Sequence, residues 1–107
     1  MKPLLRDTPL DTDVKSVYDV LEAYKVLHGS ARVTCYRQNS ASIRIRIIDP
    51  DFQDSDRVKR DDTLWEILGR LPEDVQSQIT MLLLLTPDEA QTSFANMDFE
   101  NPIPSRL

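Results

Sequence analysis

Arginine and tyrosine side chains recur at even-numbered positions along two short stretches of alternating polar and apolar residues. They are Arg32, Tyr36, Arg44 and Arg46. Because successive residues of a strand point to opposite faces, side chains at even positions share one face of a sheet. A guanidinium pairs with phosphate oxygens, and an aromatic ring stacks on a base. The set therefore predicts an anion-binding or nucleic-acid-binding face.

A purely structural interpretation of this basic face stays open. Its arginines would then be solvated or paired with acids of the same surface. With so few basic groups, any phosphate binding would be weak and sensitive to salt. The net charge of −5 also argues against general affinity for nucleic acid.

A continuous apolar run at 79–85 predicts a strand that is buried on both faces. If Met81, Leu83 and Leu85 face the helices, Leu82 and Leu84 face outward. Two leucines on an outer sheet face would form an apolar patch. Two covers stay open: a second copy of the chain, which gives a homodimer, or the C-terminal tail. The tail residues suited to this cover are Phe99, Ile103 and Leu107.

The acidic segment 49–62 is the one stretch whose composition suggests a metal ion. Its acids are Asp49, Asp51, Asp54, Asp56, Asp61 and Asp62. Carboxylates bind Ca²⁺ or Mg²⁺, but the segment lacks the central glycine and the closing glutamate of an EF-hand loop. We interpret it as a solvated loop with helix-capping aspartates, and we expect no metal site.

Catalytic chemistry has no clear set of residues. Cys35 lies on the apolar side of a predicted strand, where a thiol packs as a small apolar group. His28, the only histidine, suits the C-terminal end of a helix. No nucleophile, base and orienting group stand in a recognisable pattern, and no glycine-rich phosphate loop is present. We expect no catalytic residues and no cofactor.

Periodicity predicts the elements in the first half of the chain. Apolar residues at helical spacing, from Val14 to Leu27, follow the capping residues at 11–13 and predict a helix over 12–28. Strict alternation predicts strands at 31–37 and 42–48, joined by a turn. The isoleucines of the second strand should face the core and its arginines the opposite side.

The second half is predicted to contain two helices, the strand at 79–85 and a last helix. Leu64, Trp65 and Leu68 indicate a core-facing helix that starts near position 62 and ends at Pro72, and a short helix follows. The last helix, over 88–97, should point Phe94 and Met97 inward. Residues 1–10 are expected to be an extended lead-in, 11–97 a single domain and 98–107 an extended tail.

The order of elements is therefore α–β–β–α–α–β–α, and the fold class is α+β. It predicts a three-stranded mixed sheet with helices on one face, the two central helices forming the crossover. This order resembles the class II KH-like topology and, within it, the BolA family. Residues that match the BolA signature at compatible spacing are Phe52, Val58, Arg60, Leu64 and Trp65. Asp49, Thr86–Pro87 and Glu89 look similar too, so the resemblance covers about 12–95.

The resemblance implies a small binding module, with departures at named positions. Asp54 stands where the family has glycine, and Asp61 stands where it has its signature histidine. BolA proteins share a 2Fe–2S cluster with monothiol glutaredoxins through a histidine ligand, so iron–sulfur binding does not carry over. No Gly-x-x-Gly loop of the KH type is present.

Composition limits where such a module works. The chain has 107 residues, 40% of them apolar, and a single cysteine, so no internal disulfide can form. This favours a reducing compartment, and we expect a soluble cytoplasmic protein with no signal peptide and no membrane partner. The expected function is a non-catalytic binding or adaptor module that acts through protein–protein contacts and self-associates. The alternative is a weak nucleic-acid-binding domain.

Overall fold

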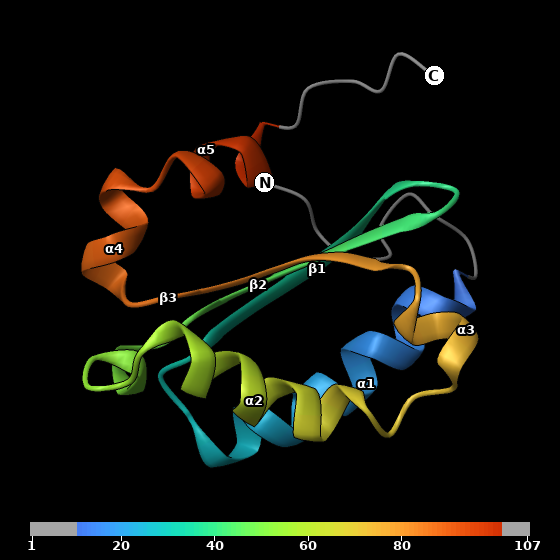
Figure 1. Cartoon of the computed structure of the whole chain (residues 1–107), viewed down its shortest axis with the longest axis horizontal. Helices are drawn as coiled ribbons and strands as arrows, with labels where there is room; N and C mark the ends of the chain where they lie inside the picture. The colour runs from blue at the N-terminus through green and yellow to red at the C-terminus, as the bar shows by residue number, and fades with distance from the viewer. Residues whose placement is uncertain (1–10, 102–107) are drawn as a thin grey trace.

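The computed structural model describes residues 11–101 of the chain. Its elements are α1 (Thr12–Leu27), β1 (Arg32–Asn39), β2 (Ser42–Ile48), the 3-10 helix η1 (Pro50–Phe52), α2 (Arg57–Leu68), α3 (Glu73–Gln76), β3 (Ile79–Leu85), α4 (Pro87–Thr92) and α5 (Phe94–Glu100). The predicted α+β class and the predicted order of elements are confirmed (Figure 1). The predicted lead-in at 1–10 lies outside the described residues.

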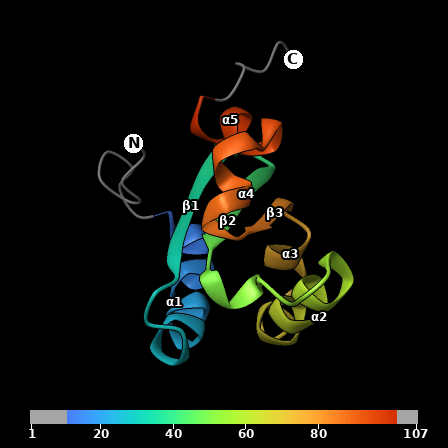
Figure 2. The same cartoon turned by 90° about the vertical axis from the view of Figure 1, so that its left-hand side faces the viewer.

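The sheet has three strands in the order β1–β2–β3. β1 and β2 pair antiparallel, and β2 and β3 pair parallel, so the sheet is mixed as predicted. The parallel pair requires a crossover, which α2 and α3 provide. Helices α1, α2 and α3 lie below the sheet, whereas α4 and α5 lie above it (Figures 1 and 2). The C-terminal helices thus add a cover on the second face.

Helix α1 begins where the capping signal predicts. The Asp11 side chain accepts a hydrogen bond from the backbone N–H of Val14 at 3.1 Å. The buried residues of α1 are Val14, Val17, Leu21 and Tyr24. Leu27, expected to continue this stripe, is 81% exposed. The stripe repeats at alternating spacings of three and four, so its next position is residue 28, and His28 stacks on Tyr24 there.

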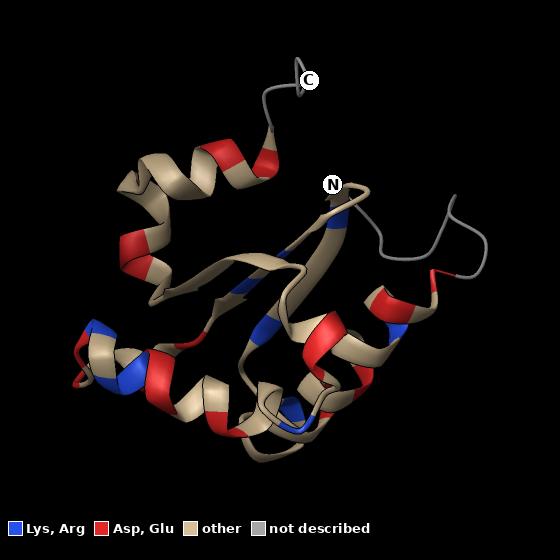
Figure 3. Cartoon of the chain, turned by 45° about the vertical axis from the view of Figure 1, so that its right-hand side comes forward, with Lys and Arg blue, Asp and Glu red and all other residues tan. Residues whose placement is uncertain are grey.

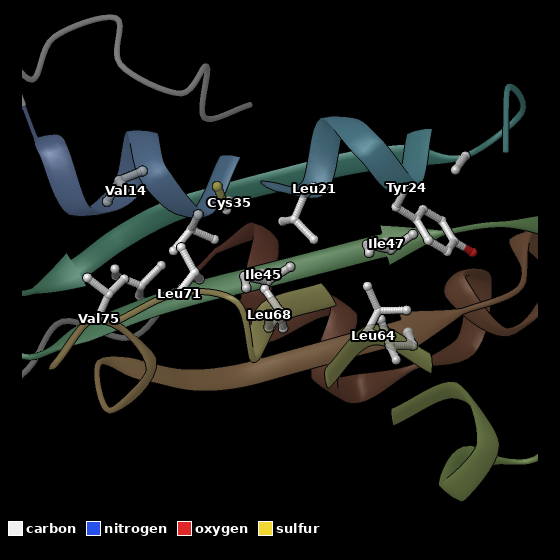
Figure 4. Close-up of a cluster of buried hydrophobic side chains, with 14 of the residues drawn as sticks. Val14, Leu21, Tyr24, Cys35, Ile45, Ile47, Leu64, Leu68, Leu71 and Val75 are labelled. Atoms are coloured by element: carbon white, nitrogen blue, oxygen red, sulfur yellow. The ribbon is translucent and has the colours of Figure 1, made fainter. Parts of the chain in front are cut away.

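The core lies between the lower helices and the sheet (Figure 4). Ile43, Ile45 and Ile47 are fully buried, which confirms the predicted facing of β2. They pack with Leu64 and Leu68 of α2 and with the α1 stripe. The described residues contain no helix that is long and apolar enough to cross a membrane.

The prediction that Leu82 and Leu84 face outward is wrong. In β3, Leu82 pairs with Ile45 and Leu84 pairs with Ile47, so both side chains join the core. The register shifts between the Ile43–Ile79 pair and the next pair, Arg44–Met81, which leaves Thr80 as an extra residue. A bulge of one residue reverses the facing of everything after it.

The predicted last helix is two helices, and the prediction that Phe94 and Met97 point inward is wrong. Ser93 has an extended backbone, ends α4 and caps α5 by accepting a hydrogen bond from the Asn96 N–H. The break turns Phe94 into solvent, where it is 86% exposed, and Met97 is exposed as well. Phe99 is the buried aromatic of α5, with 1% of its surface exposed.

Helix α5 continues to Glu100, so the first residues of the predicted extended tail are helical. Phe99 covers the sheet, as the tail was expected to do, but it covers the upper face rather than Leu82 and Leu84. Ile103 and Leu107, the other suggested cover residues, lie outside the described residues.

The acidic segment is more ordered than a solvated loop. It forms η1, which buries Phe52, and α2 then begins at Arg57 with Asp56 as its cap, earlier than predicted. Trp65, which we expected to anchor the core, is 37% exposed.

Candidate functional site

The predicted basic face is present, but α5 covers most of it. Arg44 donates a hydrogen bond to Asp98 at 3.0 Å, and Arg46 pairs with Glu100 and donates to the Asn96 side chain at 2.9 Å. Figure 3 shows that α5 carries acidic positions and lies above basic positions on the strands. Arg44 and Arg46 are thus paired with acids of the same molecule, as the structural interpretation of the basic face expects.

Tyr36 belongs to the same contact. Its hydroxyl donates to the Phe99 carbonyl at 2.9 Å, and the two rings meet edge to face at 4.9 Å between centroids. The Arg46 guanidinium lies 4.7 Å from the centre of the Phe99 ring. The aromatic and guanidinium surfaces that would take a base or a phosphate are therefore occupied by α5. Arg32 stands apart, exposed at the end of β1 beside α4.

β3 is one of the two edge strands of the sheet, the other being β1. Among residues 11–101, no fourth strand pairs with β3. The Leu85 carbonyl accepts from the Asp49 N–H, so Leu85 directs its backbone toward β2. In a parallel ladder alternate residues direct their backbone groups to opposite sides. Leu82 and Leu84 therefore turn their backbone groups away from β2, toward the free edge.

Arg60 of α2 occupies one end of this edge. Its guanidinium donates to the outward Leu84 carbonyl at 3.0 Å and to the Phe52 carbonyl at 2.8 Å. It also pairs with Glu89 at 2.7 Å, which lowers the pKa of that carboxyl. From across the free edge, the Leu82 N–H, the Leu82 carbonyl and the Leu84 N–H form no hydrogen bond with any of the described residues.

A groove of about 120 Å³ runs between this edge and α2. Its lining residues are Arg57, Arg60, Asp61 and Leu82–Leu85. Residues three or four apart share one flank of a helix, so Val58 and Trp65 lie on the same flank as Asp61. Both are among the exposed large apolar side chains of the molecule. The α2 wall of the groove is formed by Arg57, Arg60 and Asp61, and the exposed Val58 and Trp65 lie on the same helix outside that lining. The sequence prediction missed this groove.

A second cluster joins α1 to the acidic segment. The His28 Nδ1 atom lies 2.8 Å from an Asp51 carboxylate oxygen and 3.4 Å from the Asp49 Oδ2 atom. The Tyr24 hydroxyl donates to the same Asp49 oxygen, and burial together with this bond raises the pKa of Tyr24. The sequence carries no signal that would bring His28 to these aspartates, because 21 and 23 residues separate it from Asp49 and Asp51 and no local motif links them.

Cys35 is enclosed in the core and does not take part in either cluster. Burial raises the pKa of its thiol to about 12. The thiolate, the nucleophilic form, is therefore almost absent near neutral pH. This agrees with the prediction that Cys35 packs as a small apolar residue.

Comparison with family models, with curated proteins and with solved structures found no match to this chain. The resemblance to the BolA family therefore stays a prediction. Two of the residues that carry this resemblance are buried in the structure. Phe52 belongs to the core, and the Arg60 guanidinium donates hydrogen bonds to Ser55, Phe52, Leu84 and Glu89.

Proposed function

We propose that this chain is a non-catalytic protein-binding module that takes up an extended segment of a partner protein along the free edge of β3. The observation that carries the proposal is the outward-facing backbone of Leu82 and Leu84 beside the groove under α2. Addition of a peptide strand to a sheet edge satisfies such backbone groups and gives affinity through main-chain hydrogen bonds.

The flank of α2 supplies the side-chain part of the interface. Trp65 is partly exposed, and tryptophan is enriched among the residues that dominate binding energies. Val58 and Trp65 offer apolar contacts, and Arg57 and Asp61 place one charge of each sign between them and the strand. The segment that fits is extended, with apolar side chains at alternate positions facing α2.

The position of α2 favours a peptide over a second copy of the chain. In Figure 2, α2 lies below and outside the β3 edge, on the side away from β1. Edge-to-edge pairing of two whole domains would bring their α2 helices together, whereas a single strand fills the groove that the structure presents. The covered basic face gives no observation in favour of the nucleic-acid alternative.

Selection of linear peptides displayed on phage, followed by titration, tests the proposal. Trp65 is the only tryptophan and lies on the helix that lines the groove, so a change in its fluorescence reports a peptide that contacts α2. We expect selected peptides to be rich in alternating apolar residues and to shift this fluorescence. Trp65→Ala should weaken peptide binding at least tenfold. Because this variant has no tryptophan, its affinity is measured from the NMR shifts of the Leu82 and Leu84 amides.

Val26→Ala is the control, because Val26 is an exposed apolar residue on α1, away from α2 and β3. It should leave peptide affinity unchanged. Peptides that bind equally well to both variants and shift amides away from β3 would contradict the proposal. If sedimentation detects a dimer that Trp65→Ala abolishes, a second copy of the chain, and not a peptide, occupies the β3 edge.

A further inference from the structure

Three potential metal ligands converge where α1 meets η1. They are the His28 Nδ1 atom and one carboxylate oxygen each from Asp49 and Asp51, and all three atoms lie within 4.8 Å of one another. The set comes from the end of a helix and from the segment that follows β2, so the fold rather than a local motif assembles it.

The cluster of His28, Asp49 and Asp51 holds more negative than positive charge. Asp49 is fully buried, with 0% of its surface exposed. Among the described residues, His28 is the one basic side chain within ion-pair distance of either carboxylate. Two carboxylates thus share at most one positive charge, and a buried carboxylate without full compensation is costly. A divalent cation would balance the pair.

The distances suit a small cation with mixed nitrogen and oxygen ligands. Zn²⁺ holds imidazole nitrogen and carboxylate oxygen at about 2.0–2.1 Å, so two ligand atoms of a tetrahedral site lie roughly 3.3 Å apart. His28 Nδ1 and the Asp49 oxygen are already 3.4 Å apart. Asp51, at 2.8 Å from His28, is the exposed member and has only to move outward by a fraction of an ångström.

The ligands are also held in place by residues behind them. The His28 ring stacks on the Tyr24 ring at 4.1 Å with an angle of 9° between the planes. The Tyr24 hydroxyl and the Asp51 N–H each donate to the Asp49 carboxylate, which fixes its orientation. Support of this kind around the ligands is typical of metal sites.

We propose that His28, Asp49 and Asp51 form a site for a transition-metal dication of the Zn²⁺ type, open to solvent at its remaining positions. Imidazole combined with carboxylate favours Zn²⁺ over Mg²⁺ or Ca²⁺, which prefer oxygen ligands alone. The site is separate from the β3 groove, so its test does not depend on the proposed partner.

Calorimetric titration of the full chain with Zn²⁺, and separately with Mg²⁺, tests the site. We expect saturable binding of one Zn²⁺ and much weaker binding of Mg²⁺. Since His28 is the only histidine, its imidazole NMR signals should shift with the same midpoint. His28→Gln and Asp51→Asn should each weaken Zn²⁺ binding at least about tenfold.

Asp54→Asn is the control, because Asp54 is an exposed acid of the same segment. It should bind Zn²⁺ like the parent chain. Circular dichroism of each variant separates lost ligation from lost folding, and Asp51, being exposed, can change without a cost to the core. The proposal is overturned if no saturable Zn²⁺ binding occurs, or if Asp51→Asn and Asp54→Asn bind equally well.

Discussion

Asp11 ties the start of α1 to the edge strand β1 through Arg37. Its carboxylate accepts from the Val14 N–H and from the Arg37 guanidinium, and Arg37 lowers the pKa of Asp11 below its usual value of 3.8. A carboxyl with a lowered folded pKa contributes stability above its unfolded pKa and loses it as the pH falls through the folded value.

We therefore predict that Asp11→Asn lowers the free energy of unfolding by about 1.5–3 kcal/mol near neutral pH, the usual size for a charged hydrogen bond. Urea titrations of parent and variant at several pH values measure this difference. It should shrink as the pH drops below about 4, where the parent carboxyl takes up a proton. A difference that stays constant down to the lowest pH would show that the charge of Asp11 is irrelevant.

The Cys35 thiol gives a prediction of reactivity. Because burial raises its pKa to about 12, the folded chain should react with a disulfide reagent at about pH 8 only as fast as it unfolds. The same thiol should react at once in denaturant. Immediate reaction of the folded protein would mean that β1 is not enclosed as the structure has it.

At the scale of single residues, the sequence predicted which side chains share a face better than it predicted which residues contact them. Arg44, Arg46 and Tyr36 do share one face, because strand alternation fixes facing locally. The acids of α5 that cover them are 54 residues away from those arginines in the chain. The approach of His28 to Asp51 likewise depends on tertiary packing, so neither pairing has a local signal.

The elements were predictable where one face is buried and the other is not. Alternation in β2 and the α1 stripe from Val14 to Tyr24 predicted the right elements and the right facing, whereas Leu27 at the end of the stripe is exposed. In β3 the apolar residues are continuous, so the pattern indicates a strand without saying which side chains point inward. The bulge at Thr80 then reverses the facing that Ile79 alone would suggest. In the C-terminal helix, Ser93 introduces a break that helical spacing does not reveal.

Helix α5 depends on one aromatic anchor. Phe99 packs on Tyr36 and under Arg46, whereas Phe94 on the same helix projects into solvent. Phe99→Ala should lower the free energy of unfolding by about 3 kcal/mol, since large-to-small changes of buried phenylalanine cost about 3–5 kcal/mol. Thermal or chemical unfolding measures the change.

Phe94→Ala is the matched control and should change stability by less than about 0.5 kcal/mol. Equal effects of the two substitutions would contradict the placement of α5 on the sheet.

On the scale of the whole molecule, the two faces of the sheet are both covered, and β1 and β3 are its two edge strands. Helices α1 to α3 bury the lower face, and α4 and α5 cover the upper one (Figures 1 and 2). An uncovered edge of high β-propensity is a hazard for aggregation unless it has a designated partner. Arg60 blocks one end of the β3 edge, and the groove beside the edge is lined on the α2 side by Arg57, Arg60 and Asp61. This arrangement explains why we place the function at the edge rather than on a face.

Hydrogen exchange at single amides of β3 tests that claim most directly. In the free protein the Leu82 and Leu84 amides should exchange much faster than those of Leu83 and Leu85, which point toward β2. On addition of a selected peptide the two fast amides should become protected, and Trp65→Ala should abolish that protection. Leu82 and Leu84 amides that are already as protected as their neighbours in the free chain would contradict the proposed open edge.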